Sequence, residues 1–283
     1  GCKRGGACEH GEGVFLADTI EGGNRLEHSR QPLWFFPGRS GFVSVGAQMS
    51  KGMLAKMVED LKNWQPRPRP ERVVLEGRYA RLEPLSAAKH GDGLFEAATE
   101  GDSDARFRYL GEVTPRSRAE FQPWLDRVEA SEDPLYYVVI DKKTGRVAGR
   151  QTFLRIDPAN GVIEIGHIHW GPLMARKPAA TEAHFLFMQY AFDTLGYRRW
   201  EWKCNNRNEP SKRAADRFGF AFEGIFRQHM VIKGENRDTA WYSVIDKEWP
   251  ALKRAYEGWL DPSNFDSDGN QKRRLEDFRK SLA

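Results

Sequence analysis

Apolar and polar residues follow two different periods between residues 73 and 246. Alternation with a period of two, or clustering of β-branched and aromatic residues, predicts strands. These segments are 73–85 (a hairpin or bulged strand), 136–141, 146–157, 162–170 and 197–204, with a final hairpin over 222–246 that turns at 234–236. Spacings of three to four residues predict one or two helices within 86–130 and further helices at 181–196 and 208–220. This order predicts an α/β (α+β) sandwich on one mixed, mostly antiparallel central sheet flanked by helices.

The segments on either side of this region carry weaker patterns. Residues 1–48 precede the first methionine, are rich in glycine and show no useful periodicity, so we expect a poorly ordered extension or leader. Residues 49–71 predict a short helix and then a proline-rich linker, because the alternating prolines cannot continue a helix. We expect the folded domain at 72–247, followed at 248–283 by a surface helix and a charged tail.

Composition narrows the classes of function. Lysine plus arginine total 44 against 40 for aspartate plus glutamate, and the formal net charge of +4 is too small to indicate a nucleic acid partner. No apolar run is long enough to span a membrane, and no secretory signal pattern is visible, so we expect a cytoplasmic protein without a membrane partner, as a monomer or homodimer. Cys2, Cys8 and Cys204 are too few for a disulfide framework, and Cys2, Cys8 and His10 lack a fourth ligand, so no metal site is expected.

The most informative stretch runs from the strand 162–170 through a loop of small residues into the helix 181–196. Loop amides and the helix dipole favour an anion at such a junction. Arg176 and Lys177 add two full positive charges. The local chemistry therefore suits a pyrophosphate, with the rest of the ligand along the strand.

The sequence EIGHIHWGPLMARKPAATEA at 164–183 resembles the acetyl-CoA motif of the GNAT acetyltransferase superfamily, in the subgroup of the Rim-type ribosomal-protein N-terminal acetyltransferases. Further motifs follow in the family's order: an N-x-x-S at 208–211, an R-F-G-F at 217–220, an F-E-G-x-x-R at 222–227 and Asp238. The resemblance covers about 73–247. It implies a single GNAT domain, acetyl-CoA as co-substrate and direct transfer of its acetyl group to a primary amine.

Two positions depart from the family pattern. Ala175 stands where the family has Gln or Arg, with the basic side chain one residue later at Arg176, and Pro178 replaces the central glycine. Proline has no N–H, so one donor to the pyrophosphate is missing. The remaining predicted donors to the pyrophosphate are the backbone amides of the other loop residues and the hydroxyl of Thr181. The predicted cofactor-binding loop consists of Ala175, Arg176, Lys177, Ala179, Ala180 and Thr181.

The resemblance also implies roles for residues in the neighbouring motifs. The backbone of Ile168, His169 and Trp170 is predicted to contact the pantetheine and the thioester oxygen, and the strand has one residue more than the family spacing, so a bulge is plausible. Ser211 is the predicted donor to the leaving thiolate, with Asn208 on the pantetheine amide. Tyr109, Trp241 and Tyr242 are predicted on the substrate side, whereas Cys204 is interpreted as structural.

The general base and the activity itself stay open at this point. Glu164, His167 and His169 are candidate bases, with Glu164 first because it matches the family pattern; strand alternation puts it opposite the two histidines unless the bulge intervenes. The favoured hypothesis is an N-acetyltransferase acting on a protein N-terminus or a small amine. The alternatives are a non-catalytic acyl-CoA-binding module, suggested by Ala175 and Pro178, and a polyanion binder using the basic segments.

Overall fold

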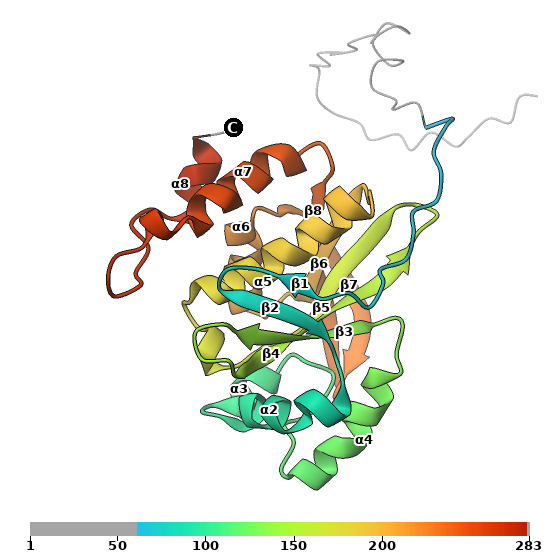
Figure 1. The fold of residues 1–283 in the computed structure, drawn as a ribbon. Coiled ribbons are helices and arrows are strands. Elements are labelled where there is room, and N and C mark those ends of the chain that lie inside the picture. The colour runs from blue at the N-terminus through green and yellow to red at the C-terminus, as the bar shows by residue number, and fades with distance from the viewer. Residues whose placement is uncertain (1–60, 282–283) are drawn as a thin grey trace, which may run out of the picture. The chain divides into compact units, whose positions relative to one another are not determined.

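One mixed sheet organises the part of the chain that the computed structural model describes, residues 61–281 (Figure 1). Its eight strands lie in the order β1-β2-β3-β4-β5-β6-β8-β7. They are β1 (Leu75–Glu76), β2 (Ala80–Pro84), β3 (Leu135–Asp141), β4 (Val147–Asp157), β5 (Val162–Trp170), β6 (Arg199–Asn205), β7 (Ala221–Ile232) and β8 (Glu235–Ile245). Only β5 and β6 run parallel, so the predicted mixed, mostly antiparallel sheet is confirmed.

Helices cover both faces of the sheet. The α-helices are α2 (Ala87–Thr99), α3 (Ser103–Phe107), α4 (Arg118–Glu129), α5 (Pro178–Gln189), α6 (Glu209–Phe218), α7 (Trp249–Leu260) and α8 (Leu275–Lys280). Alternate residues of β3 divide between two cores: Tyr137 packs with α5 and α7, whereas Tyr136 packs with α2 and α4. Figure 1 shows α2, α3 and α4 gathered at one end of the fold, and α7 and α8 at the other.

The region 86–130 holds three helices rather than the predicted one or two. Two side chains explain why an additional helix begins in this region. The carboxylate of Asp102 accepts a hydrogen bond from the Ala105 amide and begins the short α3, and the hydroxyl of Ser117 accepts from the Glu120 amide and begins α4. The loop between them, residues 108–117, borders the site described below.

The helix predicted at 181–196 begins three residues earlier and ends in a different geometry. Pro178 occupies the first turn of α5, where a missing N–H costs nothing. The helix continues as a π-helical segment, Tyr190–Thr194, and the chain reverses at Gly196 with φ of +71°. The final hairpin also turns slightly earlier than predicted, at Lys233 and Gly234.

The segments flanking the predicted domain pack against it where they are described. The indole N–H of Trp64, in the proline-rich segment, donates to the Ala159 carbonyl at 2.7 Å. Helix α7 buries Trp249, Tyr256 and Trp259 in the main core, and a helix, α8, forms where the charged tail was expected. The predicted extension 1–48 and most of the short helix after it lie outside the described residues. No helix within 61–281 combines the length and apolar character that crossing a membrane requires.

Candidate functional site

A β-bulge interrupts β5 near its C-terminal end. Thr152 of β4 pairs with Gly166, but Arg150, two residues earlier, pairs with His169, so β5 holds one extra residue. His167 lies within the bulge with φ of +45°, and its carbonyl oxygen accepts a 2.9 Å hydrogen bond from Arg150 Nη1. The bulge expected from the motif spacing is therefore present, and Arg150 holds it from the neighbouring strand.

A pocket of about 240 Å³, here called the small pocket, lies along β5 and β6. It is lined by the loop after α3, by β4 to β8 and by the start of α6. Six residues nominated from the sequence line it together: Tyr109, Glu164, His167, Ile168, Asn208 and Ser211. The fold thus gathers residues that lie about a hundred positions apart in the chain.

A larger groove of about 900 Å³ lies at the N-terminus of α5. The nominated residues that line it are Trp170, Ala175, Arg176, Lys177, Ala180 and Thr181. Arg213 and Arg217 of α6 add two further positive charges, and the lining contains no Asp or Glu. Ala179 is buried beside the groove. Positive side chains at a helix N-terminus create a site for a phosphate-bearing ligand.

Some of the nominated donors in this groove already have partners. The amides of Lys177 and Ala180 donate to the carbonyls of Met174 and Lys177 at 3.3 Å, and the Thr181 hydroxyl accepts from Arg217 Nη1 at 3.0 Å. Thr181 therefore connects α5 to the guanidinium of Arg217. Arg176 takes a left-handed backbone conformation, with φ of +57°, just before α5 begins.

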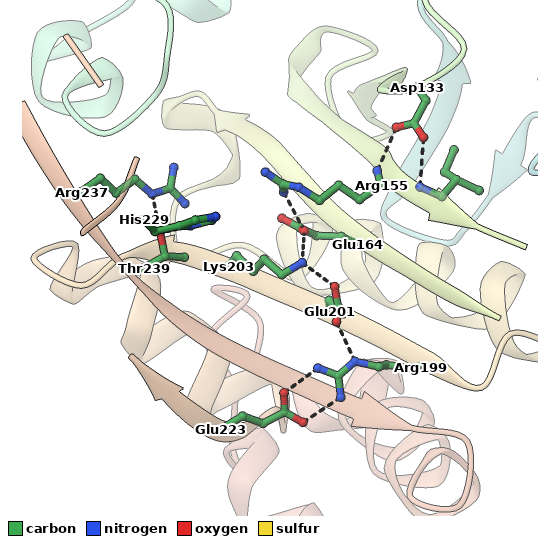
Figure 2. Close-up of polar contacts among 11 residues, drawn as sticks. Asp133, Arg155, Glu164, Arg199, Glu201, Lys203, Glu223, His229, Arg237 and Thr239 are labelled. Atoms are coloured by element: carbon green, nitrogen blue, oxygen red, sulfur yellow. Dashed lines mark hydrogen bonds and ion pairs between the residues drawn. The ribbon is translucent and has the colours of Figure 1, made fainter. Parts of the chain in front are cut away.

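Glu164 is held in a chain of ion pairs that crosses the sheet (Figure 2). Its Oε2 lies 2.8 Å from Arg155 Nη1 and 2.9 Å from Lys203 Nζ. Lys203 also contacts Glu201 at 2.5 Å, and Arg199 joins Glu201 to Glu223. The side chains of Glu164 and Lys203 are 3% and 5% exposed. Glu164, the carboxylate that matches the family pattern, thus already forms ion pairs with two cationic side chains.

His167 faces the small pocket from the bulge, and Glu112 of the loop between α3 and α4 lies behind it. Glu112 Oε1 is 3.7 Å from His167 Nδ1 and 3.3 Å from Arg150 Nη2. Burial alone would raise the pKa of the Glu112 carboxyl, but Arg150 and His167 hold it well below the usual range. Glu112 is therefore an anion that can orient the imidazole.

His169 does not line the small pocket. Its side chain is buried and its ring centroid lies 4.6 Å from that of Phe107. Burial and the Arg150 charge lower the pKa of His169 to about 3, so the imidazole is neutral at ordinary pH. Both histidines lie near Glu112 and Arg150, but only His167 lines the small pocket.

Ser211 and Asn208 lie together at the start of α6. The Asn208 carbonyl oxygen accepts from the Ser211 amide at 3.2 Å and caps the helix. The Ser211 hydroxyl accepts from the Trp202 indole at 3.0 Å and also forms a hydrogen bond with the side chain of Cys204. Cys204 beside them is buried, and burial raises the pKa of its thiol.

The three substrate-side nominations lie in different surroundings. Tyr109 lines the small pocket, and its hydroxyl donates to the Arg207 carbonyl at 3.0 Å. Trp241 and Tyr242 line neither cavity. The Trp241 ring lies under Lys203, with Nζ 4.0 Å from the ring centroid, and Tyr242 is buried against Phe222.

Sequence reasoning missed Glu112 and Arg150. Glu112 lies in a loop without periodicity, so nothing near it in the sequence marks it. Arg150 offered one signal, since it is a charged residue inside a strand predicted to be largely buried, and it is 3% exposed. Among residues 61–281, no group of three or more His, Cys, Asp and Glu side chains is arranged to hold a metal ion.

Comparison with known proteins identifies relatives of this fold and site. The sequence model described as "Acetyltransferase (GNAT) domain" matches residues 80–221. A crystal structure of a GCN5-related N-acetyltransferase from Brucella melitensis shares 67% identity with a TM-score of 0.77, covering 78% of this chain and 100% of that one. The "Uncharacterized N-acetyltransferase p20" of Bacillus licheniformis is 32% identical over 117 residues, 40% of this chain and 63% of the relative's own length. "Putative ribosomal N-acetyltransferase YdaF" of Bacillus subtilis is 27% identical over 62% of this chain and 88% of the relative.

Proposed function

The chain belongs to the GNAT acetyltransferase family, whose co-substrate is acetyl-CoA, and on that premise we propose that it transfers the acetyl group directly to a primary amine. The acceptor is the N-terminus of a protein or a small-molecule amine. The relative named as a ribosomal N-acetyltransferase supports the first of these. The observation that carries the proposal is the succession of the two cavities along β5, with Ile168 lining the small pocket and Trp170 the groove.

In this proposal acetyl-CoA lies along β5 with its pyrophosphate at the N-terminus of α5. Arg176 and Lys177 provide charge there, and the missing amide of Pro178 is offset by the further cations from α6. The pantetheine passes Asn208, and the thioester reaches the bulge. Backbone N–H groups freed from the ladder by the bulge are then available to the developing oxyanion. The Ser211 hydroxyl donates to the leaving thiolate.

We propose His167, oriented by Glu112, as the group that removes the amine proton. Glu164 ranked first from the sequence, but its carboxylate is held by Arg155 and Lys203. His167 is the half-buried alternative on the same pocket wall, with an anionic partner behind it. Cations around a bound amine also disfavour its ammonium form, which reduces the demand on the base.

A thiol assay with acetyl-CoA and a panel of amines tests the function. His167→Gln should lower kcat by about 10²- to 10⁴-fold. Glu164→Gln should change kcat much less, and a larger loss in Glu164→Gln than in His167→Gln would return Glu164 to the role of base. Ser211→Ala should lower kcat more than acetyl-CoA affinity, and an unchanged rate would remove Ser211 from the mechanism.

The second candidate function is a non-catalytic acyl-CoA-binding module, favoured by the substitutions Ala175 and Pro178 in the loop. Calorimetry separates the two, since both bind acetyl-CoA but only the enzyme releases thiol. Binding of acetyl-CoA without thiol release from any amine would contradict the transferase.

A further inference from the structure

The walls of the small pocket carry more positive than negative charge. Four lining residues are lysine or arginine, and Glu164 is the one acidic residue in the lining. The four cations are Arg106, Arg155, Lys203 and Arg237. An amine acceptor is itself a cation in water, so this excess disfavours its ammonium form and does not attract it into the pocket.

The ion-pair chain accounts for two of these cations. Arg155, Lys203 and Arg199 alternate along it with Glu164, Glu201 and Glu223, so three positive charges face three negative ones. Arg155 and Lys203 are therefore balanced within the protein. Arg106, in contrast, is directed at the carbonyl of Glu100 at the end of α2.

The positive charge of Arg237 on β8 is not balanced by a carboxylate in this way. Its Nε donates to the Thr239 hydroxyl at 3.1 Å (Figure 2), and no carboxylate within the described residues forms an ion pair with it. The adjacent carboxylate, Asp238, accepts instead from the Gln228 amide and Asn236. Burial lowers the pKa of Arg237, against opposing contributions from Cys204 and Glu164.

The phosphates of acetyl-CoA do not explain Arg237. They have their own cations in the groove at α5, which Arg237 does not line. Arg237 lies in the small pocket, opposite the ion pair of Glu164 and Lys203 on β5 and β6 (Figure 2). The pocket is also small, at about 240 Å³, so it admits the amine end of an acceptor and a short group beside it.

We propose that the acceptor amine carries a carboxylate close to it, and that Arg237 binds this carboxylate. The proposal rests on the proposed function and names its substrate class. A guanidinium pairs with a carboxylate through two parallel hydrogen bonds, which fixes both the position and the orientation of the ligand. The carboxylate comes either from the C-terminus of a very short acceptor or from an acidic side chain next to the reacting N-terminus.

Matched pairs of peptides test the proposal and separate the two sources. Alanyl-alanine against its C-terminal amide tests a terminal carboxylate. Ala-Asp-Ala amide against Ala-Asn-Ala amide tests an acidic side chain. With saturating acetyl-CoA, we expect the carboxylate member of at least one pair to have a 10- to 100-fold higher kcat/KM in the thiol assay, the range of a charge-assisted hydrogen bond.

Arg237→Gln should abolish this preference by lowering kcat/KM for the carboxylate member alone. Arg237→Lys keeps the charge but loses the fork of donors, so it should retain part of the preference. Arg227→Gln is the matched control, because it makes the same charge change at an exposed position of β7 outside the pocket lining.

The outcomes separate this inference from the function on which it rests. Equal turnover of both members of each pair by the wild type overturns the carboxylate, while the transferase stands. A preference that survives Arg237→Gln, or an equal loss on both members in both Arg237 variants, overturns the role of Arg237. Absence of thiol release from every peptide contradicts the proposed function and the inference with it.

Discussion

Replacing Lys203 by methionine tests the ion-pair chain beneath the small pocket. Methionine keeps most of the apolar stem over Trp241 and removes only the charge. Glu164 and Glu201 then lose the cation that they share, at 2.9 and 2.5 Å. Both carboxylates are almost completely buried, so water cannot replace the lost partner.

The expected loss of stability follows from these contacts. Breaking a buried ion pair costs about 3–5 kcal/mol, and the low end applies because each carboxylate keeps one arginine. Those remaining contacts are Arg155–Glu164 at 2.8 Å and Arg199–Glu201 at 2.6 Å. A loss of about 3 kcal/mol corresponds to a decrease in Tm of roughly 6–12 °C for a domain of this size.

Urea and thermal unfolding measure this loss, with Lys253→Met as the matched control. Lys253 pairs with Asp193 at 2.7 Å, but both side chains are about one third exposed, so its loss should cost less than about 1 kcal/mol. In the double variant Lys203→Met/Glu164→Gln, neutralising one stranded carboxylate should restore part of the stability. Equal Tm decreases for the two lysine variants would refute the reasoning.

Three further outcomes are expected. Gly149→Ala should lower the free energy of unfolding by about 2 kcal/mol or more in urea titration, because Gly149 has φ of +155° and a Cβ there would lie 2.3 Å from the His169 carbonyl oxygen; an unchanged midpoint would contradict this. Pro178→Gly should tighten acetyl-CoA in calorimetry if the absent amide is the defect, and weaker binding would mean that the proline shapes the loop. Burial is the main cause that lowers the pKa values of His169 and His184 to about 3. Below the ordinary histidine pKa near 6.5, the unfolded chain therefore binds more protons than the folded protein. The free energy of unfolding should then fall by up to about 1.4 kcal/mol per pH unit per histidine as the pH decreases from 6.5 to 5. A flat stability over that range, above the carboxylate titrations, would exclude the effect.

The sequence predicted those parts of the fold that depend on local patterns. Alternation located the strands, and the extra residue between Glu164 and Pro178 indicated the bulge that the register now confirms. Gly219 ends α6 in the left-handed conformation that a helix C-terminus favours. These features depend on residues that are neighbours in the chain.

The arrangement of the pocket depends on residues that are distant in the chain. Glu112 and Arg150 meet at 3.3 Å only because the loop after α3 folds back over β4. The burial of His169 could not be read from alternation, because one bulged residue reverses the side on which each following side chain lies. The sequence did not indicate that Lys203 would form an ion pair with Glu164, because only the parallel pairing of β5 and β6 brings the two residues together.

The C-terminal segment forms part of the groove, which links ligand binding there to the docking of this segment. Trp259 of α7, Phe265 and the loop at 269–271 form one wall of it, although the family match ends at residue 221. A ligand that fills the groove contacts both the central domain and this later segment, so binding and docking of the segment are linked. At a ligand concentration of 100 times Kd, this linkage stabilises the docked state by at most about 2.7 kcal/mol, the value for a ligand that binds that state alone. Bound acetyl-CoA would then stabilise the docked state of the C-terminal segment, and proteolysis within 266–270 would slow as the acetyl-CoA concentration rises.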